Sequence, residues 1–380
     1  MSTTSVTEDF SQLRADCEFR AEVHDERYRV REAIGVGEWL YDPQLRFATE
    51  DGAVVLSDIG GQPERGFDPT AGHGAIYRFT ADDRLETISP PGMHGVTAPL
   101  RPEQAPPWFG GWGGHLFFIA QAESGRVGAH KGHRLYRMDP ADGIPHAFAD
   151  LPHHGPVGGG VPGAGMTGTF GPKGSPHEGY LFCQSLVNCV VYRIDPDGNA
   201  EPYLVMAPPL VERPMMPFLT FVAPDHSQWR DVAGEVIIAT RATTYLEHGE
   251  AKTDLQYWRI DDSDRSVHPV TGMQWRAGPI APEGFGPYAG HMFTVDEGST
   301  NLLHASINEL NAKPLPYDAR ILRIAPDGSE HVFVDGIQGG STTLVFAGNR
   351  LVAASSRKSY STGEYHEPDG SIFVVEPAGS

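Results

Sequence analysis

Tyr192-Arg193-Ile194-Asp195-Pro196-Asp197-Gly198 decides the fold, because it closes a short apolar run with a turn and because its opening dipeptide recurs along the chain. In the turn, proline presets one backbone angle and glycine supplies a positive φ. Equivalent dipeptides close apolar runs at intervals of 51 to 66 residues, at Tyr77-Arg78, Tyr136-Arg137, Tyr192-Arg193, Trp258-Arg259, Leu322-Arg323 and Phe373-Val374. Six units of hairpin-bearing sequence at this spacing predict a β-propeller.

Further runs in each unit indicate how many strands a blade contains. Upstream of every dipeptide, a glycine or asparagine opens a second apolar run, at Gly52–Asp58, Gly114–Ala120, Gly179–Ser185, Gly234–Thr240, Gly290–Asp296 and Asn349–Ser355. Three units carry an earlier segment that fits an innermost strand with a tight turn, at Phe109–Gly114, Phe170–Gly174 and Phe285–Gly290. An outer strand follows the turn, as in Ala147–Leu151 and His331–Asp335. The sequence therefore predicts an all-β, six-bladed β-propeller with four strands per blade.

The N-terminal residues are predicted to form a short helical arm. With 45 glycines and 32 prolines in 380 residues, there is little room for long helices, and only Glu8–Arg31 has a helix-like pattern. The last unit has no room for a full outer strand after Pro377. Residues around 28 to 36 are therefore expected to complete that blade and close the ring, which removes exposed sheet edges. The predicted division is residues 1–36 for the arm and ring-closing segment, and residues 37–380 for the propeller.

The charge and the cysteines limit the expected partners and compartment. A net charge of −20 argues against a nucleic-acid or anionic-membrane partner. The sequence contains no apolar run of 18 residues, and residues 1–12 lack the pattern of a signal peptide, so a cytoplasmic protein is expected. Cys17, Cys183 and Cys189 have no metal-ligand spacing and suit a reducing compartment. Cys183 lies in a strand pattern and is expected in the core; its pairing with Cys189 remains an alternative.

Histidines in the long loops are the first candidate catalytic residues. In a propeller, loops from an outer strand to the next inner strand emerge on the same face as loops from the second strand to the third. His94, and either His153 or His154, fall at comparable places in consecutive units, near the expected mouth of the central tunnel. Two imidazoles that face one pocket suit metal ligation or acid–base catalysis near neutral pH. The alternative is that these histidines bond to backbone carbonyl groups.

Carboxylates at the ends of the second strands are the candidate metal ligands. Aligned by the preceding glycine, only Asp58 and Asp296 place a carboxylate at this position. If they converge near the axis, their oxygens suit Ca²⁺ or Mg²⁺; otherwise each caps a turn or bonds backbone amides. Gln121 and Arg241 follow the same strand ends in other units and are candidate substrate-binding residues. A guanidinium suits a substrate carboxylate or a developing oxyanion.

The blade pattern, together with Gly37-Glu38-Trp39-Leu40-Tyr41-Asp42 and the run Asp51–Asp58, resembles six-bladed propellers of the gluconolactonase, regucalcin, diisopropyl-fluorophosphatase, paraoxonase and strictosidine-synthase group. The resemblance covers about residues 37 to 378. It implies that a glutamate near the start of the first blade ligates an axial divalent cation, and Glu38 is the matching position. The usual Glu-Gly-Pro is replaced here by Glu-Trp-Leu, and the remaining ligands of the family cannot be carried over to this sequence.

The strictosidine-synthase branch of this group implies that the scaffold can also work without a metal, through an acid–base carboxylate. Glu283 is the candidate, because it lies in Ala281-Pro282-Glu283-Gly284-Phe285-Gly286 among apolar and aromatic residues. Burial in such surroundings would raise its pKa and suit it to shuttle protons. The alternative is a solvated carboxylate in a loop.

These features favour an enzyme that acts on a small organic molecule in the central pocket. The leading hypothesis is hydrolysis of a lactone or ester, assisted by a divalent cation such as Ca²⁺. The alternatives are a metal-independent lyase, isomerase or cyclase that uses Glu283 and the histidines, and a non-enzymatic propeller that binds a protein or peptide.

Overall fold

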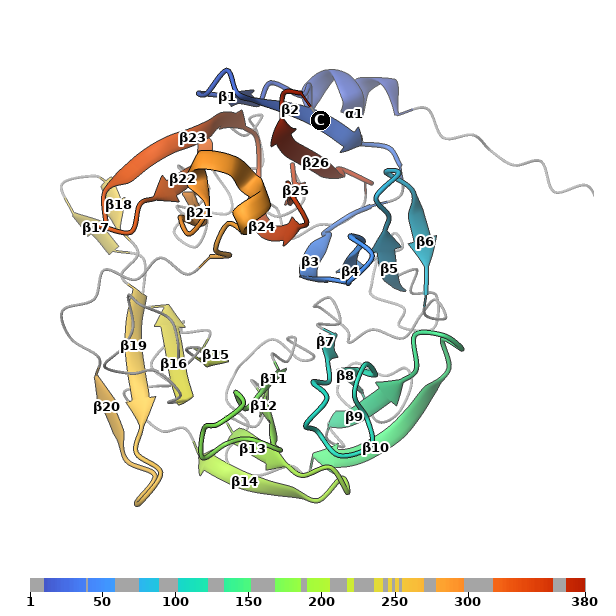
Figure 1. Ribbon diagram of the computed structural model, residues 1–380, viewed down its shortest axis with the longest axis vertical. Helices are drawn as coiled ribbons and strands as arrows, with labels where there is room; N and C mark the ends of the chain where they lie inside the picture. Colours follow the sequence, from blue (N-terminus) through green and yellow to red (C-terminus); the bar gives the residue numbers. More distant parts are fainter. Residues whose placement is uncertain are drawn as a thin grey trace, which may run out of the picture.

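The computed structural model describes residues 10–38, 40–58, 75–88, 102–121, 133–151, 168–185, 190–205, 217–221, 236–241, 245–247, 250–252, 255–269, 278–296, 317–357 and 367–379. Strands dominate these residues and form six four-stranded sheets and one two-stranded sheet. The four-stranded sheets stand around a common centre (Figure 1). The all-β arrangement predicted from the repeats is therefore present, and it is that of a β-propeller.

Sheets 1 to 4 follow the chain, each from its innermost strand outward. Sheet 1 contains β3 (Gln44–Ala48), β4 (Val54–Asp58), β5 (Ala75–Phe79) and β6 (Leu85–Thr87). Sheet 2 contains β7 (Glu103–Gln104), β8 (Leu116–Gln121), β9 (His133–Met138) and β10 (Pro145–Leu151). Sheet 3 contains β11 (Gly168–Phe170), β12 (Leu181–Ser185), β13 (Val190–Ile194) and β14 (Ala200–Val205). Sheet 4 contains β15 (Pro217–Phe221), β16 (Val236–Arg241), β19 (Leu255–Ile260) and β20 (Val267–Pro269), and the hairpin β17 (Tyr245–Glu247) and β18 (Glu250–Lys252) lies between β16 and β19 in sequence.

Sheets 5 and 6 each take one strand from the N-terminal part of the chain. Sheet 5 contains β21 (Met292–Asp296), β22 (Ala319–Ile324), β23 (Glu330–Ile337) and β1 (Glu22–Val23). Sheet 6 contains β24 (Gly340–Ala347), β25 (Arg350–Ser356), β26 (Gly370–Pro377) and β2 (Tyr28–Ile34). The sequence predicts that residues 28 to 36 complete the last blade, and β2 does so by pairing with β26. The pairing of β1 with β23 has no counterpart in the sequence prediction.

The predicted helix over Glu8–Arg31 is wrong beyond its first part. The helix α1 covers only Ser11–Asp16, and β1 and most of β2 lie within the rest of that segment. A helix of six residues gains little from its own hydrogen bonds. The outer edges of β23 and β26, in contrast, offer unpaired backbone groups that β1 and β2 satisfy.

The first strand of sheet 5 is reduced to a short bridge. Ile280 pairs with Met292 at the start of β21, and the Ala281 N–H donates to the His291 carbonyl at 2.8 Å. The short helix η2 (Glu283–Tyr288) follows and leads into β21. Residues 279–281 therefore hold the place of an innermost strand, and η2 connects the first strand position to the second.

The two ends of the ring carry different connections. In every sheet, the end of the second strand pairs with the start of the third, as in Asp58 with Ala75 and Asp296 with Arg320. We call this end of the ring the mouth face. The opposite end, where first strands turn into second strands and third strands into fourth, is the turn face. Contacts between neighbouring sheets join like ends: at the mouth face, the Ser356 hydroxyl of sheet 6 donates to the Tyr41 carbonyl, which precedes sheet 1, at 2.9 Å.

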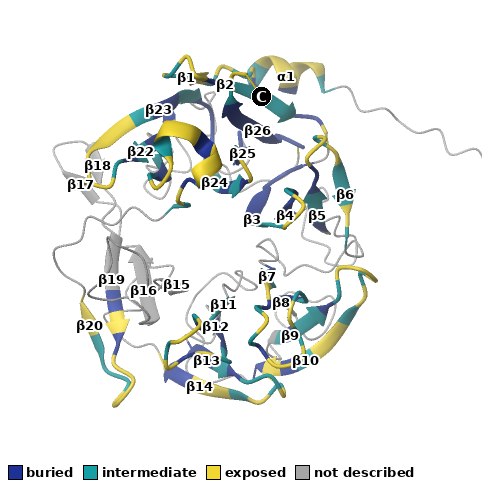
Figure 2. Cartoon of the chain, in the orientation of Figure 1, coloured by how far each residue is buried: buried dark blue, intermediate teal, exposed yellow. Residues whose placement is uncertain are grey.

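The hydrophobic core is divided among the interfaces between neighbouring sheets. Buried residues run along β25 and β26 (Figure 2). Five clusters in the described part of the chain join pairs of sheets and include Leu56 and Val374 (sheets 1 and 6), Val55 and Phe118 (1 and 2), Leu135 and Tyr192 (2 and 3), Phe182 and Trp258 (3 and 4), and Phe293 and Phe373 (5 and 6). Cys183 belongs to the core as predicted; it is a free cysteine, and burial raises the pKa of its thiol. Cys189 lies outside the described residues.

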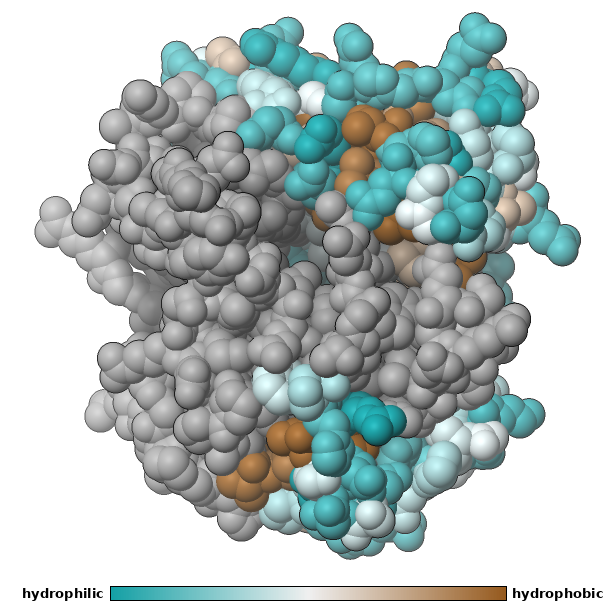
Figure 3. Space-filling model, turned by 90° about the vertical axis from the view of Figure 1, so that its left-hand side faces the viewer, coloured by the Kyte–Doolittle hydropathy of each residue, from teal (hydrophilic) through white to brown (hydrophobic). Residues whose placement is uncertain are grey.

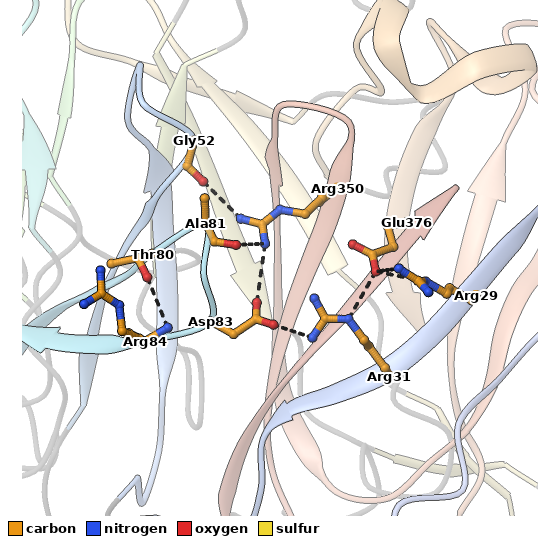
Figure 4. A network of polar contacts seen from close by, with 9 residues as sticks. All are labelled: Arg29, Arg31, Gly52, Thr80, Ala81, Asp83, Arg84, Arg350 and Glu376. Atoms are coloured by element: carbon orange, nitrogen blue, oxygen red, sulfur yellow. Dashed lines mark hydrogen bonds and ion pairs between the residues drawn. The ribbon is translucent and has the colours of Figure 1, made fainter. Parts of the chain in front are cut away.

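Ion pairs join the N-terminal strand β2 to the last and first sheets at the turn face (Figure 4). Glu376 of β26 accepts from Arg29 and Arg31 of β2, with Nε–Oε1 distances of 3.0 and 3.1 Å. Arg31 also donates to Asp83 of sheet 1 at 2.5 Å. Arg350, the first residue of β25, donates to Asp83 at 3.4 Å and to the Ala81 and Gly52 carbonyls. These contacts tie the closing sheet to the first sheet.

The described surface is mostly hydrophilic in side view, with smaller hydrophobic groups between (Figure 3). Among the described residues, no helix has the length and apolar character needed to cross a membrane.

Candidate functional site at the mouth face

The mouth face brings together the strand ends that the sequence singles out. Asp58 ends β4, Gln121 ends β8, Arg241 ends β16 and Asp296 ends β21, so four sheets each contribute one of these residues at the same end of the ring. The innermost strands of neighbouring sheets contact one another around the centre, as β24 does with β3 and β7 with β11. The backbone therefore brings two aspartates, a glutamine and an arginine to the same end of the ring.

Asp58 has a clear structural partner. Its Oδ1 accepts hydrogen bonds from the backbone N–H groups of Tyr41 (2.9 Å) and Asp42 (2.7 Å), and the residue is 1% exposed. Tyr41 and Asp42 belong to the connection from β2 of sheet 6 to β3 of sheet 1, so the carboxylate holds this connection in place. Burial, reinforced by the nearby Asp58 and Tyr41, raises the pKa of Tyr77 to about 12. The alternative of a carboxylate bonded to backbone amides therefore describes Asp58.

The connection that Asp58 holds is fixed at further points by buried polar groups. The Gly370 N–H donates to the Leu40 carbonyl at 2.8 Å, and Gln44 Nε2 donates to Asp42 Oδ1 at 2.8 Å. Asp42, Gln44, Ser57, Asp58, Ser355, Ser356, Asp369 and Ser371 are all buried at this end of sheets 1 and 6. Those with fixed partners, such as Asp58 and Gln44, hold the backbone in one geometry, whereas the Ser57 hydroxyl has no partner among the described residues. The rim of the mouth between sheets 6 and 1 is thus rigid.

The three predicted metal ligands do not form a cation site. Asp296 forms an ion pair with Arg320 of the neighbouring strand, with an Oδ2–Nη2 distance of 2.6 Å. Glu38 is exposed, and the Asp58 oxygen described above already serves two amides. Among the described residues, no group of three His, Cys, Asp or Glu side chains is placed to hold a metal ion. A divalent cation held by Glu38, Asp58 and Asp296 therefore does not fit these residues as they lie, and no chemical step is assigned to it.

Strand pairing fixes the backbone positions of Gln121 and Arg241. Gln121 pairs with His133 across β8 and β9, and Arg241 pairs with Leu255 across β16 and β19. Both therefore end their second strands at the mouth face, as the sequence predicts. The predicted catalytic histidines His94, His153 and His154 lie outside the described residues.

Glu283 lies at the opposite end of the ring from the position that the sequence suggests. The prediction treats it as part of a loop from an outer to an inner strand. Because residues 279–281 take the innermost strand position, Glu283 follows that strand and opens η2 on the turn face. The strand β21 begins at Met292 on the turn face and rises about 3.3 Å per residue. Its last residue, Asp296, therefore lies at the mouth face, about 13 Å from Met292. Glu283 is also exposed, so the apolar surroundings expected to bury its carboxylate are absent.

Arg357 is a buried charged residue that the sequence analysis does not identify. It follows β25 at the mouth face and is 2% exposed. Its Nε donates to Ser371 Oγ at 2.9 Å, and its Nη2 donates to Glu32 Oε1 of β2 at 2.9 Å. Burial lowers the pKa of Arg357 and raises the pKa of Glu32, and their mutual attraction opposes both shifts. The sequence does give one indication of Arg357, because Ser355-Ser356-Arg357 ends a second apolar run. The partner of Arg357, Glu32, lies near the other end of the chain.

No protein-family model matches the sequence, and no curated protein matches it. Solved structures match over most of the chain. A protein provisionally assigned as a gluconolactonase shares 12% sequence identity, with 94% of each chain covered and a TM-score of 0.47. An α-L-arabinofuranosidase of Fusarium graminearum shares 11% identity, with 90% of this chain and 98% of its own covered and a TM-score of 0.49.

An oligogalacturonate lyase of Vibrio parahaemolyticus shares 11% identity, with 95% of this chain and 97% of its own covered and a TM-score of 0.39. The resemblance to the gluconolactonase group is thus found in structural comparison as well as in the sequence. At these identities and scores, the likeness does not indicate a substrate or a reaction for this chain.

Proposed function

We propose that the six sheets are the blades of one six-bladed propeller, and that the protein is an enzyme that acts on a small organic molecule at the mouth face. The observation that carries this proposal is the gathering of Asp58, Gln121, Arg241 and Asp296 at the second-strand ends of four sheets. A small molecule over the axis would meet side chains from several sheets at once. Ligand sites of this kind have a few convergent polar groups in a rigid surround.

The reaction that we propose is hydrolysis of a lactone or ester. Arg241 suits the charge that develops on the carbonyl oxygen during such a reaction, because a guanidinium donates several hydrogen bonds from a fixed plane. Gln121 would orient the substrate through its amide. The buried polar groups of sheets 6 and 1 support the proposal because they keep the rim of the site in one geometry.

The position of Glu283 does not support the metal-independent alternative of a lyase, isomerase or cyclase. This alternative assigns proton transfer to Glu283, but that carboxylate is exposed on the turn face. A group that transfers a proton must lie within hydrogen-bond reach of the reacting atoms. The position of Glu283 on the turn face therefore does not support it as the base for a substrate at the mouth face.

A panel of lactones and esters tests the proposal with the wild-type protein and two variants. Arg241→Gln should lower kcat/KM by about a hundredfold, as expected for the loss of a donor to a developing oxyanion. Glu283→Gln, at the opposite end of the ring, should change kcat/KM by less than about twofold, within the range expected of a surface substitution. Parallel assays with a chelator test whether a divalent cation takes part.

The absence of turnover on every lactone and ester would contradict the proposed reaction. A loss in Glu283→Gln as large as that in Arg241→Gln would instead show that catalysis occurs on the turn face.

A further inference from the structure

The arginines of the repeated dipeptides occupy matching positions in the sheets but have different partners. Each lies on the third strand, opposite a residue of the fourth: Arg78 opposite Glu86, Arg193 opposite Glu201 and Arg137 opposite His146. Arg78 Nη1 lies 3.1 Å from Glu86 Oε2, and Arg193 Nε donates to Glu201 Oε1 at 2.7 Å. In the described part of the chain, Arg137 makes neither an ion pair nor a hydrogen bond. Arg78 and Arg193 thus each have a carboxylate partner, and Arg323, opposite His331, bonds to His291 instead. Arg137 has neither kind of partner among the described residues.

The guanidinium of Arg137 is held in place by a ring rather than by a carboxylate. Its central carbon lies 3.9 Å from the ring centroid of Trp112. Trp112 Nε1 donates to the Pro196 carbonyl at 2.8 Å, so the indole is fixed between sheets 2 and 3. Only Nε of the guanidinium is buried without a hydrogen-bond partner among the described residues, and the two terminal nitrogens remain within reach of solvent. A buried donor without a partner is unfavourable, and an acceptor that binds it would remove this cost.

The nearby acidic residues of the turns are directed to their own backbone. Asp139 Oδ1 accepts from the Ala141 N–H at 2.9 Å, in the turn that follows Arg137. Asp195 Oδ1 accepts from the Asn199 N–H at 2.9 Å, in the facing turn of sheet 3. These carboxylates satisfy turn amides rather than the guanidinium.

We propose that Arg137 and Trp112 form a binding site for a small oxyanion of the carboxylate or phosphate class, on the turn face between sheets 2 and 3. The planar fork of arginine matches two oxygens of such an anion, and the indole beneath keeps the fork in one orientation. His146 lies beside Arg137 in the strand register, and an imidazole supplies an N–H donor. This site is at the opposite end of the ring from the proposed active site and is independent of the proposed reaction.

Isothermal titration calorimetry with inorganic phosphate and with acetate, at matched ionic strength in sodium chloride, tests the site. The wild-type protein should bind at least one of the two anions saturably, with a dissociation constant of about 1 mM, typical of a single charged contact on the surface. Arg137→Gln should weaken this binding at least tenfold. Arg137→Lys should bind more weakly than wild type, because it keeps the charge but loses the fork. Arg193→Gln is the matched control and should bind like wild type.

The two arms identify the anion: binding of phosphate alone indicates a phosphate group, binding of acetate alone indicates a carboxylate, and binding of both indicates a general oxyanion site. The same anion should raise the Tm of the wild-type protein and of Arg193→Gln but not of Arg137→Gln. The proposal is overturned if neither anion binds the wild-type protein, or if Arg137→Gln binds as tightly as wild type.

Discussion

Ser57 and Asp58 are neighbours at the end of β4 with opposite hydrogen-bonding states. The Asp58 carboxylate accepts two backbone N–H groups of the connection into sheet 1. The Ser57 hydroxyl is fully buried and has no hydrogen-bond partner among the described residues. A buried hydrogen bond to a charged group stabilises a fold, whereas a buried hydroxyl without a partner destabilises it. The burial of a polar side chain alone therefore does not show whether that side chain stabilises or destabilises the fold.

The pair yields a prediction about stability. Asp58→Ala should lower the free energy of unfolding by about 3 kcal/mol or more, because it leaves two buried N–H groups without an acceptor. Asp58→Asn, which keeps one oxygen, should cost less. Ser57→Ala is the control and should change the free energy of unfolding by no more than about 0.5 kcal/mol, or raise it. Urea unfolding measures all three, and a larger cost for Ser57→Ala than for Asp58→Ala would refute the assignment.

At the scale of the elements, the turn between β19 and β20 packs against sheet 3 through one carboxylate. Asp262 of this turn accepts from the Tyr203 hydroxyl, forms an ion pair with Arg265 at 2.7 Å and lies 3.2 Å from His177 Nε2. His177 is buried, and burial lowers its pKa, with a further lowering from Arg193 and Arg265 and an opposing effect of Asp262. The contact between sheets 3 and 4 therefore contains a histidine whose burial favours the neutral form.

This histidine gives a pH-dependent stability. Because the pKa of His177 is lower in the folded state than the unfolded value of about 6.5, the unfolded chain binds the proton more readily. The contribution of His177 to the free energy of unfolding is present above the unfolded pKa of about 6.5 and is lost as the pH falls from there through the folded pKa. His177→Gln should remove this part of the slope, which amounts to at most about 1.4 kcal/mol per pH unit.

The measurement is the free energy of unfolding by urea from pH 8 to pH 5. The difference between the wild-type protein and His177→Gln should be constant above pH 7.5, where the imidazole is neutral in both the folded and unfolded chain, and should change only below it. Parallel curves over the whole range would show that His177 does not titrate differently on folding.

The sequence predicts elements best where the signal is local. The second strand β4 (Val54–Asp58) falls inside the predicted run Gly52–Asp58, because a turn glycine and an apolar run lie next to each other in the chain. The side of the ring on which Glu283 lies could not be predicted, since it depends on whether residues 279–281 pair with β21, and such a short bridge leaves no periodic pattern. The ion pair between Arg357 and Glu32 could not be predicted either, because its partners come from opposite ends of the sequence.

At the scale of the whole molecule, the N-terminal segment completes the ring. β1 extends sheet 5, β2 completes sheet 6, and Phe19 packs against Phe373 of β26 with ring centroids 5.9 Å apart. The segment also supplies Glu32 to the buried Arg357, and Arg29 and Arg31 to Glu376. Its removal would therefore expose a sheet edge and leave buried charges without partners.

Two truncations separate these contributions. Removal of residues 1–24 takes away α1 and β1 but keeps β2, and this variant should remain folded, in the same oligomeric state as the wild-type protein, with a lower Tm. Removal of residues 1–36 also takes away β2 and leaves sheet 6 with three strands. The second variant should form soluble aggregates, because the edge of β26 is then free to pair with other chains. Size-exclusion chromatography with light scattering, combined with thermal unfolding, distinguishes the two; a stable monomer after the longer truncation would show that β2 is dispensable for closure.

The same closure sets the order in which the molecule can be assembled during synthesis. Glu22 pairs with Asp335, and Tyr28 pairs with Pro377, so the first two strands of this sequence have their partners among its last strands. Sheets 1 to 4 use only neighbouring segments and can form as they emerge, whereas β1 and β2 keep unpaired backbone groups until β23 and β26 have been made. Closing the ring therefore joins segments that lie far apart in the sequence, and we expect this long-range pairing to be a slow step of folding.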